Sequence, residues 1–412
     1  MRVLLSTYGS RGDVEPLAGL AVALQAFGAE AIVCAPPDQE FVDLLARIGV
    51  PLAPAFSPVR EWIEAAKRSK AGLPQHAARM IVAQYEAISA AATGCDAVLA
   101  TGLVPSAAAA QCVAEKLGVP NFHATFCPLF LGSHHHKPYP YPGHPHPPEV
   151  TDPRALWDLN IGVMNALFGE AVNGHRASID LPTMDNVRDH VFTSRPLLAS
   201  DPVLWPWLPT DLCEAVQTGA WLLPDKRPLP ADLEAFLNDG APPVYVGFGS
   251  IALSSTRDFA QVAIKAIRAQ GLRVVLARGW ADNAPIDEGD DCFLVGEVNQ
   301  QALFRRVAGV VHHGGAGTTT AAARAGTPQV IVPQIVDQPY WARRVAELGI
   351  GAAHDGAAPT FESFSAALGT ALTPEIRARA AAIAGTIRTD GAEIAARLLL
   401  DAISRERPPT AT

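Results

Sequence analysis

The sequence lacks the features of several common phosphate-binding and nucleic-acid-binding classes. It contains no Gly-Lys dipeptide, which excludes a Walker-type phosphate loop, because that loop needs a lysine before its Ser or Thr. Charged residues make up only 18% of the chain, and Lys plus Arg (32) are outnumbered by Asp plus Glu (41). The resulting net charge of −9 argues against a nucleic-acid partner.

Paired cysteines and long apolar runs are absent as well. The six cysteines show no C-x-x-C spacing, which predicts buried free thiols and no zinc or redox site. No apolar run approaches the ~20 residues of a membrane span. The start passes from "MRVLL" to "STYGSRGD" too soon for a signal-peptide core. We therefore expect a cytoplasmic protein without a membrane partner.

The 412 residues, 49% of them hydrophobic, contain two series in which strands alternate with helices. The first begins with a strand at 2–9 and a helix at 16–28, and the second starts near residue 243. This alternation predicts an α/β protein with two doubly wound parallel sheets, whose ligands bind beyond the carboxyl ends of the strands. The expected parts are an N-terminal domain (1–205), a proline-rich linker (206–242), a C-terminal domain (243–385) and a C-terminal helix packing back on the first domain (386–412).

The stretch "VHHGGAGTTTAAARAG", residues 311–326, places glycines and threonines at a strand-to-helix turn. Free N–H groups and the dipole of a helix N-terminus suit phosphate, and glycines let it approach the backbone. A histidine at the strand end, His313 rather than His312, can donate to a phosphate oxygen. The alternative is a tight turn whose histidines are satisfied in the core. The candidate phosphate ligands here are His313, Gly315, Gly317 and Thr318, with Thr319 as a further hydroxyl donor.

The stretch "YGSRGDVEP" occupies the equivalent turn of the first domain. Asp13 is either the N-cap of the following helix, with Pro16 in its first turn, or a carboxylate facing a ligand and available as a general base. The sequence leaves these two interpretations evenly balanced. Ser10 is a candidate phosphate contact. Arg11 is either a surface charge or a contact to an anionic ligand.

Polar and aromatic side chains also follow strands of the second series. In "PQIVDQPYWA", Asp337 and Gln338 form a natural clamp for neighbouring sugar hydroxyls, although Asp337 can instead cap a helix that has Pro339 near its start. Trp280 in "ARGWAD" can stack on a base, but a lone Trp more often belongs to the core. Ser250 in "GFGSI" is a possible further phosphate donor.

A long segment without periodicity, residues 127–148, begins at Cys127 and ends at Pro148. A loop of this length in a compact domain is usually functional. Its prolines and aromatic residues suit a wall for a bulky, partly apolar acceptor. Five histidines within it invite a metal hypothesis, but a flexible H-H-H-x-P run lacks the fixed geometry of a metal site, so we expect no metal.

Five motifs together resemble, in order and spacing, the GT-B glycosyltransferases that decorate glycopeptide antibiotics: "STYGSRGDVEP", "ARGWAD", "GEVN", "HHGGAGTT" and "DQPYWA". The resemblance covers essentially the whole chain. It implies two Rossmann-like domains facing a central cleft and an inverting, metal-independent hexosyltransferase. The acceptor would bind in the N-terminal domain, and the nucleotide-sugar, a UDP- or dTDP-sugar acting as co-substrate, in the C-terminal domain.

The resemblance also implies roles for single residues. Asp13 matches the catalytic base of the family, and Asp337 and Gln338 match the positions near the donor sugar, where Asp337 also counts among the catalytic residues. Trp280 and Val298 match the positions that hold the nucleotide base. The diphosphate contacts are matched by His313, Gly315, Gly317 and Thr318.

The two halves of the chain do not resemble the same relatives equally. From about residue 213 onward the sequence is most similar to the glucosyltransferase of vancomycin-type aglycones, whereas the first half departs more, a pattern that a hybrid chain would produce. We expect a monomer that transfers glucose from UDP-glucose to a phenolic hydroxyl of a heptapeptide aglycone, without a cofactor. The alternatives are a dTDP-deoxyaminosugar or UDP-GlcNAc transferase on the same acceptor class, a nucleotide-sugar epimerase, and a non-catalytic nucleotide carrier.

Overall fold

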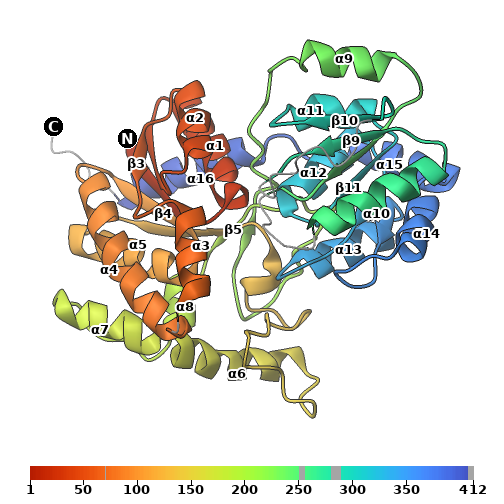
Figure 1. The fold of residues 1–412 in the computed structure, drawn as a ribbon. Coiled ribbons are helices and arrows are strands. Elements are labelled where there is room, and N and C mark those ends of the chain that lie inside the picture. The colour runs from red at the N-terminus through yellow and green to blue at the C-terminus, as the bar shows by residue number, and fades with distance from the viewer. Residues whose placement is uncertain (70, 250–255, 280–288, 407–412) are drawn as a thin grey trace. The chain divides into compact units, whose positions relative to one another are not determined.

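The computed structural model describes residues 1–69, 71–249, 256–279 and 289–406. The chain forms two compact units, which Figure 1 shows in colours from red to blue. The first comprises Met1–Ser200, Trp207–Leu223 and Thr389–Thr412, and the second comprises Asp201–Pro206 and Pro224–Arg388. The segment 206–242, expected to be a linker, therefore contributes strand β7 (Val216–Gln217) to the first unit and helix α9 (Ala231–Asn238) to the second.

The described part of the first unit contains a seven-stranded parallel sheet in the order β3-β2-β1-β4-β5-β6-β7. Its other strands are β1 (Arg2–Tyr8), β2 (Glu30–Ala35), β3 (Leu52–Pro54), β4 (Ala97–Gly102), β5 (Asn121–Thr125) and β6 (Leu197–Leu198). Its helices are α1 (Arg11–Ala26), α2 (Gln39–Arg47), α3 (Val59–Arg68), α4 (Leu73–Ala91), α5 (Val104–Leu117), the 3-10 turn η1 (Pro128–Phe130), α6 (Pro153–Met164), the π-helical turn η2 (Asn165–Gly169), α7 (Glu170–Ser178), α8 (Val187–Phe192) and α16 (Gly391–Glu406).

The described part of the second unit contains a six-stranded parallel sheet in the order β10-β9-β8-β11-β12-β13. Its strands are β8 (Val244–Gly247), β9 (Val274–Ala277), β10 (Cys292–Val295), β11 (Gly309–His312), β12 (Gln329–Ile331) and β13 (Gly351–Ala353). The remaining helices are α10 (Thr256–Ala269), α11 (Gln300–Leu303), the 3-10 turn η3 (Phe304–Arg306), α12 (Ala316–Ala325), α13 (Gln338–Glu347), α14 (Phe361–Ala371) and α15 (Pro374–Ala384). The prediction of two doubly wound parallel sheets is confirmed.

Alternating apolar residues build the core of the second unit on both faces of its sheet. In β8, Val244 and Val246 belong to a cluster with Phe259 of α10, whereas Tyr245 between them belongs to a second cluster with Phe304. Successive side chains of a strand point to opposite faces, so a continuous apolar run is buried on both sides. This two-sided burial fixes the strands and therefore the loops at their carboxyl ends.

The C-terminal segment that was expected to be a helix, 386–412, contains α16. Helix α15 ends at Ala384, and α16 starts at Gly391. Gly391 lies against the main chain of Gly219 and Ala220, because a Cβ at Gly391 would be 2.6 Å from Ala220 O. Helix α16 then packs on α1 within the first unit. The break at 385–390 thus coincides with the return of the chain to the first unit.

Acidification should unfold the chain through its buried histidines, of which His123 in β5 is a clear example. Its side chain is 2% exposed and its Nδ1 has no hydrogen-bond partner among the described residues. Burial lowers the pKa of His123 from 6.5 to about 4. Below about pH 6.5 the unfolded chain binds a proton that the folded chain takes up only near pH 4. The free energy of unfolding therefore falls as the pH drops through this window, by up to roughly 3 kcal/mol for this residue.

Urea unfolding of the wild type and of His123→Phe at several pH values between 7.5 and 4.5 tests this expectation. The substitution keeps a ring edge-on to Phe192, whose centroid lies 5.0 Å from that of His123. The variant should lose stability less steeply below pH 6.5, and the two chains should differ little in slope above it. Equal slopes across the whole range would contradict the assignment.

Candidate functional site

The glycine-rich loop lies at the point where the strand order of the second sheet reverses. Strands β8 and β11 are neighbours there although about 60 residues separate them in sequence, and such switch points are the usual ligand crevices of α/β sheets. Gly314 follows β11 with φ +96°, and a Cβ at this position would lie 2.8 Å from Ile331 Cγ2. Gly315 is the N-cap of α12. The loop therefore needs glycine at 314 for its backbone, and it presents the N-terminus of α12 beyond the sheet.

His312 supports this loop from behind. It is fully buried, its Nδ1 accepts a hydrogen bond from Gly314 N (3.1 Å), and its Nε2 lies 2.9 Å from Gln329 Oε1. Because Nδ1 is an acceptor, the ring proton sits on Nε2 and is donated to Gln329. Gln329 in turn donates from Nε2 to Thr319 O (3.3 Å) in α12. The pair His312–Gln329 therefore joins β11, the loop, β12 and α12.

His313 points elsewhere. Its ring lies between two glycines, since a Cβ at Gly315 would be 2.7 Å from His313 Nε2 and a Cβ at Gly249 would be 3.2 Å from His313 Cε1. Its Nδ1 is buried and has no partner among the described residues. Burial lowers the pKa of His313 to about 4, so the ring is neutral at pH 7. Of the two histidines, His313 is thus the one with hydrogen-bonding capacity left for a ligand.

The threonine hydroxyls of α12 also differ in whether they bond within the protein. Thr319 and Thr320 donate to the carbonyls of Gly315 (2.9 Å) and Ala316 (2.8 Å), four residues back. The expectation that Thr319 adds a hydroxyl for phosphate is therefore wrong, because that proton is used inside the helix. Thr318 is partly exposed, and Gly317 has open space where a side chain would stand. Both remain candidates.

Breaking the His312–Gln329 pair should destabilise the second unit and loosen the loop. In Gln329→Leu the His312 Nε2–H stays buried without an acceptor, which costs about 1–3 kcal/mol of unfolding free energy. In His312→Phe the Gln329 oxygen loses its donor instead. The double variant removes both partners, so its loss should be smaller than the sum of the single losses by roughly 0.5–3 kcal/mol. Denaturant unfolding of the four chains measures this coupling, and strict additivity would show that the pair is not a unit.

Asp337 and Gln338 begin α13 just after a loop in which Val336 has φ +54°. Asp337 is at the N-cap position but makes no capping hydrogen bond with its side chain; its Oδ2 accepts from Trp341 Nε1 (2.8 Å). Gln338 Oε1 accepts from the backbone N–H groups of Gln334 (2.8 Å) and Ile335 (3.0 Å). The Asp337 side chain therefore does not cap α13. The side-chain oxygen of Gln338 accepts hydrogen bonds from its own loop, so only its Nε2 remains as a donor for a ligand.

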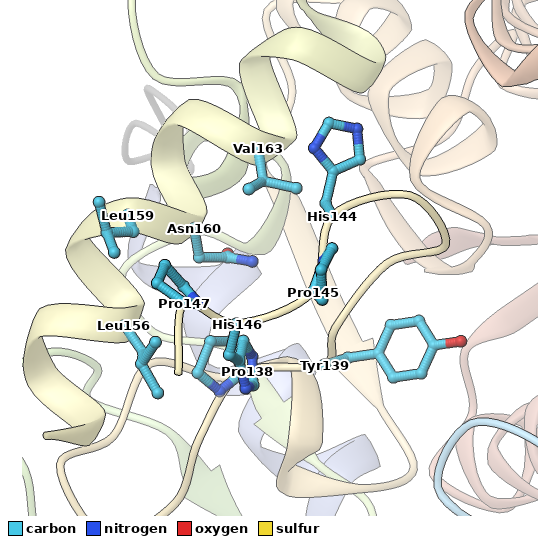
Figure 2. Close-up of a pocket in the computed structure, with 10 residues that line it drawn as sticks. All are labelled: Pro138, Tyr139, His144, Pro145, His146, Pro147, Leu156, Leu159, Asn160 and Val163. Carbon is cyan, nitrogen blue, oxygen red and sulfur yellow. The ribbon is translucent and has the colours of Figure 1, made fainter. Parts of the chain in front are cut away.

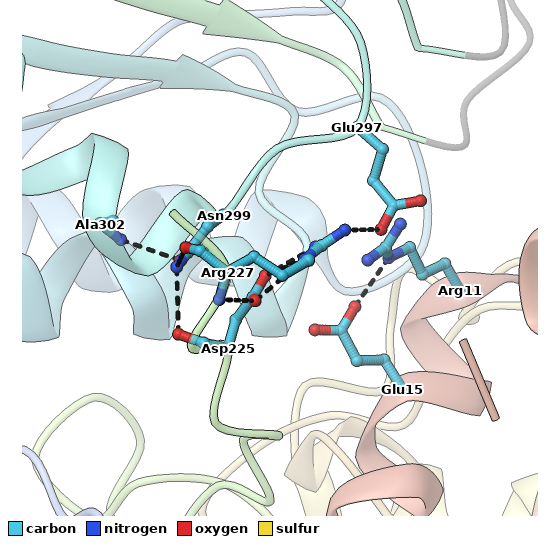
Figure 3. A network of polar contacts seen from close by, with 7 residues as sticks. All are labelled: Arg11, Glu15, Asp225, Arg227, Glu297, Asn299 and Ala302. Atoms are coloured by element: carbon cyan, nitrogen blue, oxygen red, sulfur yellow. Dashed lines mark hydrogen bonds and ion pairs between the residues drawn. The ribbon is translucent and has the colours of Figure 1, made fainter. Parts of the chain in front are cut away.

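Glu297 and Asn299, the residues on either side of Val298 in the chain, belong to a polar network that Figure 3 shows. Asn299 caps α11 by accepting from Ala302 N (3.0 Å), and its Nδ2 donates to the carbonyls of Asp225 (3.0 Å) and Arg227 (2.8 Å). Arg227 also pairs with Glu297 (3.0 Å). The Val298 side chain packs in the apolar cluster of this unit. Trp280 and Ser250 lie outside the described residues.

In the first unit, the helix after β1 begins earlier than expected. Helix α1 starts at Arg11, so Ser10, not Asp13, is its N-cap, and Pro16 lies inside the helix. The reason is a reciprocal capping box: Ser10 Oγ accepts from Gly12 N (3.4 Å), while Asp13 Oδ2 accepts from Ser10 N (2.8 Å). Arg11 pairs with Glu15 one turn along the helix (2.7 Å; Figure 3). The Asp13 carboxylate therefore lies at the carboxyl end of β1, held at the helix start.

The predicted acceptor loop, 127–148, contains only the turn η1 as regular structure and continues to α6. Figure 2 shows a pocket between this loop and α6, with Tyr139, His146 and Pro147 on one side and Leu159 and Asn160 on the other. His146 Nε2 is buried there without a partner among the described residues. The lining of this pocket is thus mostly apolar with a few polar groups.

The consecutive histidines of this loop each bind the chain itself. His136 Nε2 lies 3.0 Å from Pro128 O, and burial lowers the pKa of His136 to about 4. His135 Nε2 lies 3.0 Å from Pro209 O, and His134 Nδ1 lies 3.2 Å from Thr210 Oγ1. In the part of the chain that the structure describes, no group of three or more His, Cys, Asp or Glu side chains is placed to hold a metal ion.

The chain is 55% identical to glycosyltransferase GtfE and 54% identical to vancomycin aglycone glucosyltransferase, both of Amycolatopsis orientalis, over 99% of each chain. The chain belongs to the glycopeptide-antibiotic glycosyltransferases. It is also 50% identical to the dTDP-epi-vancosaminyltransferase of the same organism, again over 99% of both chains.

The profile of the erythromycin biosynthesis protein CIII-like C-terminal domain matches residues 286–398. The solved glycotransferase of kitacinnamycin superposes with a TM-score of 0.72 at 21% identity, over 99% of both chains. Together with the two parallel sheets, this likeness confirms the GT-B fold. No helix of the described residues is long and apolar enough to cross a membrane.

Proposed function

We propose that this glycosyltransferase transfers glucose from UDP-glucose to a phenolic hydroxyl of a glycopeptide heptapeptide aglycone, with inversion at the anomeric carbon. The observation that carries the proposal is the 54% identity over 99% of both chains to a vancomycin aglycone glucosyltransferase. The proposed setting is the cytoplasm, where the chain acts as a monomer without metal or other cofactor.

In the proposed reaction, the first unit binds the acceptor. The Asp13 carboxylate takes the proton of the acceptor hydroxyl as its oxygen attacks the anomeric carbon, and general-base help of this kind is typically worth ~10²–10⁴-fold in rate. The capping-box bond from Ser10 N (2.8 Å) orients that carboxylate. Ser10 is also proposed to contact the diphosphate through its hydroxyl.

The second unit binds the nucleotide-sugar in this proposal. As the bond from the anomeric carbon to the diphosphate oxygen breaks, negative charge grows on the leaving diphosphate. The N-terminus of α12, with Gly315, Gly317 and Thr318, and a hydrogen bond from His313 stabilise that charge. Asp337 accepts from a sugar hydroxyl while Gln338 Nε2 donates to another, which favours a fully hydroxylated sugar over a deoxygenated one.

A second donor deserves a test because a relative named as a dTDP-epi-vancosaminyltransferase is 50% identical over 99% of both chains. Mass spectrometry of wild-type reactions with UDP-glucose, UDP-GlcNAc and a dTDP-deoxyaminosugar, each with several glycopeptide aglycones, separates the candidates. Addition of one hexose from UDP-glucose is the expected product. Transfer from the dTDP-sugar alone would replace the glucose proposal, and an altered sugar nucleotide in the absence of any aglycone would favour an epimerase.

A further inference from the structure

Phe56, two residues after β3, combines a strained backbone with an exposed ring. Its φ is +67°, in the left-handed region that residues other than glycine rarely adopt. Its side chain is 40% exposed, although it is large and apolar. Glycine or asparagine would adopt this conformation more easily and would expose no ring. Strain of this kind, retained together with apolar exposure, points to a function of the ring.

Two hydrogen bonds hold the chain on the C-terminal side of Phe56. The Tyr8 hydroxyl donates to Ser57 O (3.0 Å), and the buried Asp38 carboxylate accepts from Val59 N at the start of α3 (2.7 Å). Burial raises the pKa of Tyr8 to about 12, so its hydroxyl keeps its proton for this bond at neutral pH. The conformation of Phe56 is therefore fixed by buried groups from β1 and from the turn after β2, and not by its own preference.

Two further rings stand behind Phe56. The Tyr8 ring is fully buried, with its centroid 5.9 Å from that of Phe56. Trp62 of α3 meets Tyr8 edge-on at 6.0 Å. Aromatic pairs at such distances are attractive beyond the apolar area they bury. The three rings thus form an aromatic cluster, tilted and edge-on rather than parallel, in which Phe56 is the most exposed member.

The register of the sheet places Phe56 on the same edge as the Asp13 carboxylate. One row of paired residues crosses β3, β2, β1 and β4: Ala53, Cys34, Ser6 and Ala100. Three residues beyond that row come Phe56 after β3, Gly9 after β1 and Leu103 after β4. Leu103 is 42% exposed. Asp13 lies directly over Gly9, where a Cβ would be 2.1 Å from Asp13 Oδ2.

Exposed apolar residues therefore follow the strands on either side of β1, after which Asp13 lies. With strands about 4.8 Å apart, Leu103 stands one strand from the Gly9 position and Phe56 two strands away on the other side. This spacing fits a planar ring whose hydroxyl reaches the carboxylate.

We propose that Phe56, backed by Tyr8 and Trp62, is a stacking platform for an aromatic ring of the acceptor and selects aglycones that present such a ring. The inference rests on the proposed function, because it takes the acceptor to be aromatic and Asp13 to be the group it approaches. It adds a specificity residue outside the loop 127–148.

Three variants test the platform: Phe56→Leu, Phe56→Gly and Phe56→Tyr. Aglycone affinity is measured by titration calorimetry in the presence of UDP, and KM is measured separately for aglycone and UDP-glucose. Leu and Gly should weaken aglycone binding about tenfold, equivalent to about 1.4 kcal/mol, and raise its KM alike. Tyr keeps the ring face and should stay within about twofold of the wild type, since stacking requires only the aromatic face. The affinity for UDP should not change in any of them.

Phe27 provides a matched control, because it is also 40% exposed in the first unit but follows the C-terminal end of α1. Phe27→Leu should leave both affinities unchanged. Thermal unfolding separates binding from packing: in Phe56→Gly the relief of strain offsets the lost ring contacts, so the midpoint should move by only a few degrees. A tenfold loss of aglycone affinity without a matching loss of stability supports the platform.

Several results would overturn it: wild-type aglycone affinity in the Leu and Gly variants, equal losses for aglycone and UDP, or no aglycone binding by the wild type. Failure of the proposed function looks different. A wild type that binds aglycone but transfers no sugar refutes the transfer reaction, while the comparison of aglycone affinities still decides the role of Phe56.

Discussion

Asp13→Asn is expected to lower kcat by ~10²–10⁴-fold, because an amide cannot take the proton of the attacking hydroxyl. The structure makes this substitution unusually clean. The carboxylate Oδ2 accepts from Ser10 N (2.8 Å), and the amide oxygen of asparagine can accept the same hydrogen bond. The start of α1 should therefore persist, and aglycone and UDP affinities should change little. Steady-state kinetics, calorimetry and thermal unfolding of the variant give the three required readouts.

Asp13→Ala is the companion variant, because it removes both the base and the bond to Ser10 N. It should lose as much activity as Asp13→Asn and, in addition, about 0.3–1 kcal/mol of stability from the helix N-terminus. If Asp13→Asn turns over normally while Asp13→Ala only loses stability, Asp13 is a helix-capping residue and nothing more. A non-catalytic carrier would instead bind UDP tightly and transfer no sugar in the wild type or in either variant.

The overall fold was predictable because strand and helix periodicity is a local signal. The runs around β1, β4, β8 and β11 are apolar, short and followed by helices, and parallel pairing follows from that alternation. Helix starts were less predictable. The capping box at Ser10 moved the start of α1 from the expected residue 16 to Arg11, because two polar side chains satisfied the free N–H groups earlier than the apolar pattern begins.

Within the site, the glycines and His313 were visible as residues of the right chemistry at a strand end. The sequence did not show which of the two histidines supports the loop and which is left for a ligand, because this depends on residues distant in sequence. Gln329 binds His312 from the next strand, and a glutamine inside the apolar run "TPQVIVPQ" was the available signal for a buried polar partner. The contact of Trp341 with Asp337 follows the helical spacing of four residues, and the motif "DQPYWA" contains it.

No sequence feature indicated the conformation or the exposure of Phe56. The sequence "PAFSP" does not predict a positive φ at Phe56, since residues other than glycine adopt this conformation only when surrounding groups impose it. Those groups, Tyr8 and Asp38, lie on or after other strands. Exposure, strain and strand register are properties of the assembled unit. For this reason the sequence alone indicated the loop 127–148 as the acceptor surface and not the aromatic cluster of Phe56, Tyr8 and Trp62.

His313→Ala is expected to lower kcat/KM by ~10²–10³-fold, the usual cost of removing one donor that meets charge developing in the transition state. The loss should fall mainly on kcat, with a smaller change in UDP affinity, because the charge on the diphosphate grows as the bond breaks. Burial holds the pKa of His313 at about 4, so the free ring acts as a neutral donor. Its titration should therefore not shape kcat/KM between pH 6 and 8.

His312, the neighbouring histidine, should affect stability rather than catalysis. His313 Nδ1 has no protein partner among the described residues, so His313→Gln, which keeps most of the side-chain volume, breaks no hydrogen bond from that nitrogen and should leave stability nearly unchanged. His312→Phe should behave in the opposite way, with a clear loss of stability, because it leaves Gln329 without its donor. His313→Gln, which can still donate, should recover part of the activity. Equal losses of kcat and UDP affinity in His313→Ala would mean that His313 holds the diphosphate equally in the ground state and in the transition state, and that catalysis by charge stabilisation comes from the N-terminus of α12 alone.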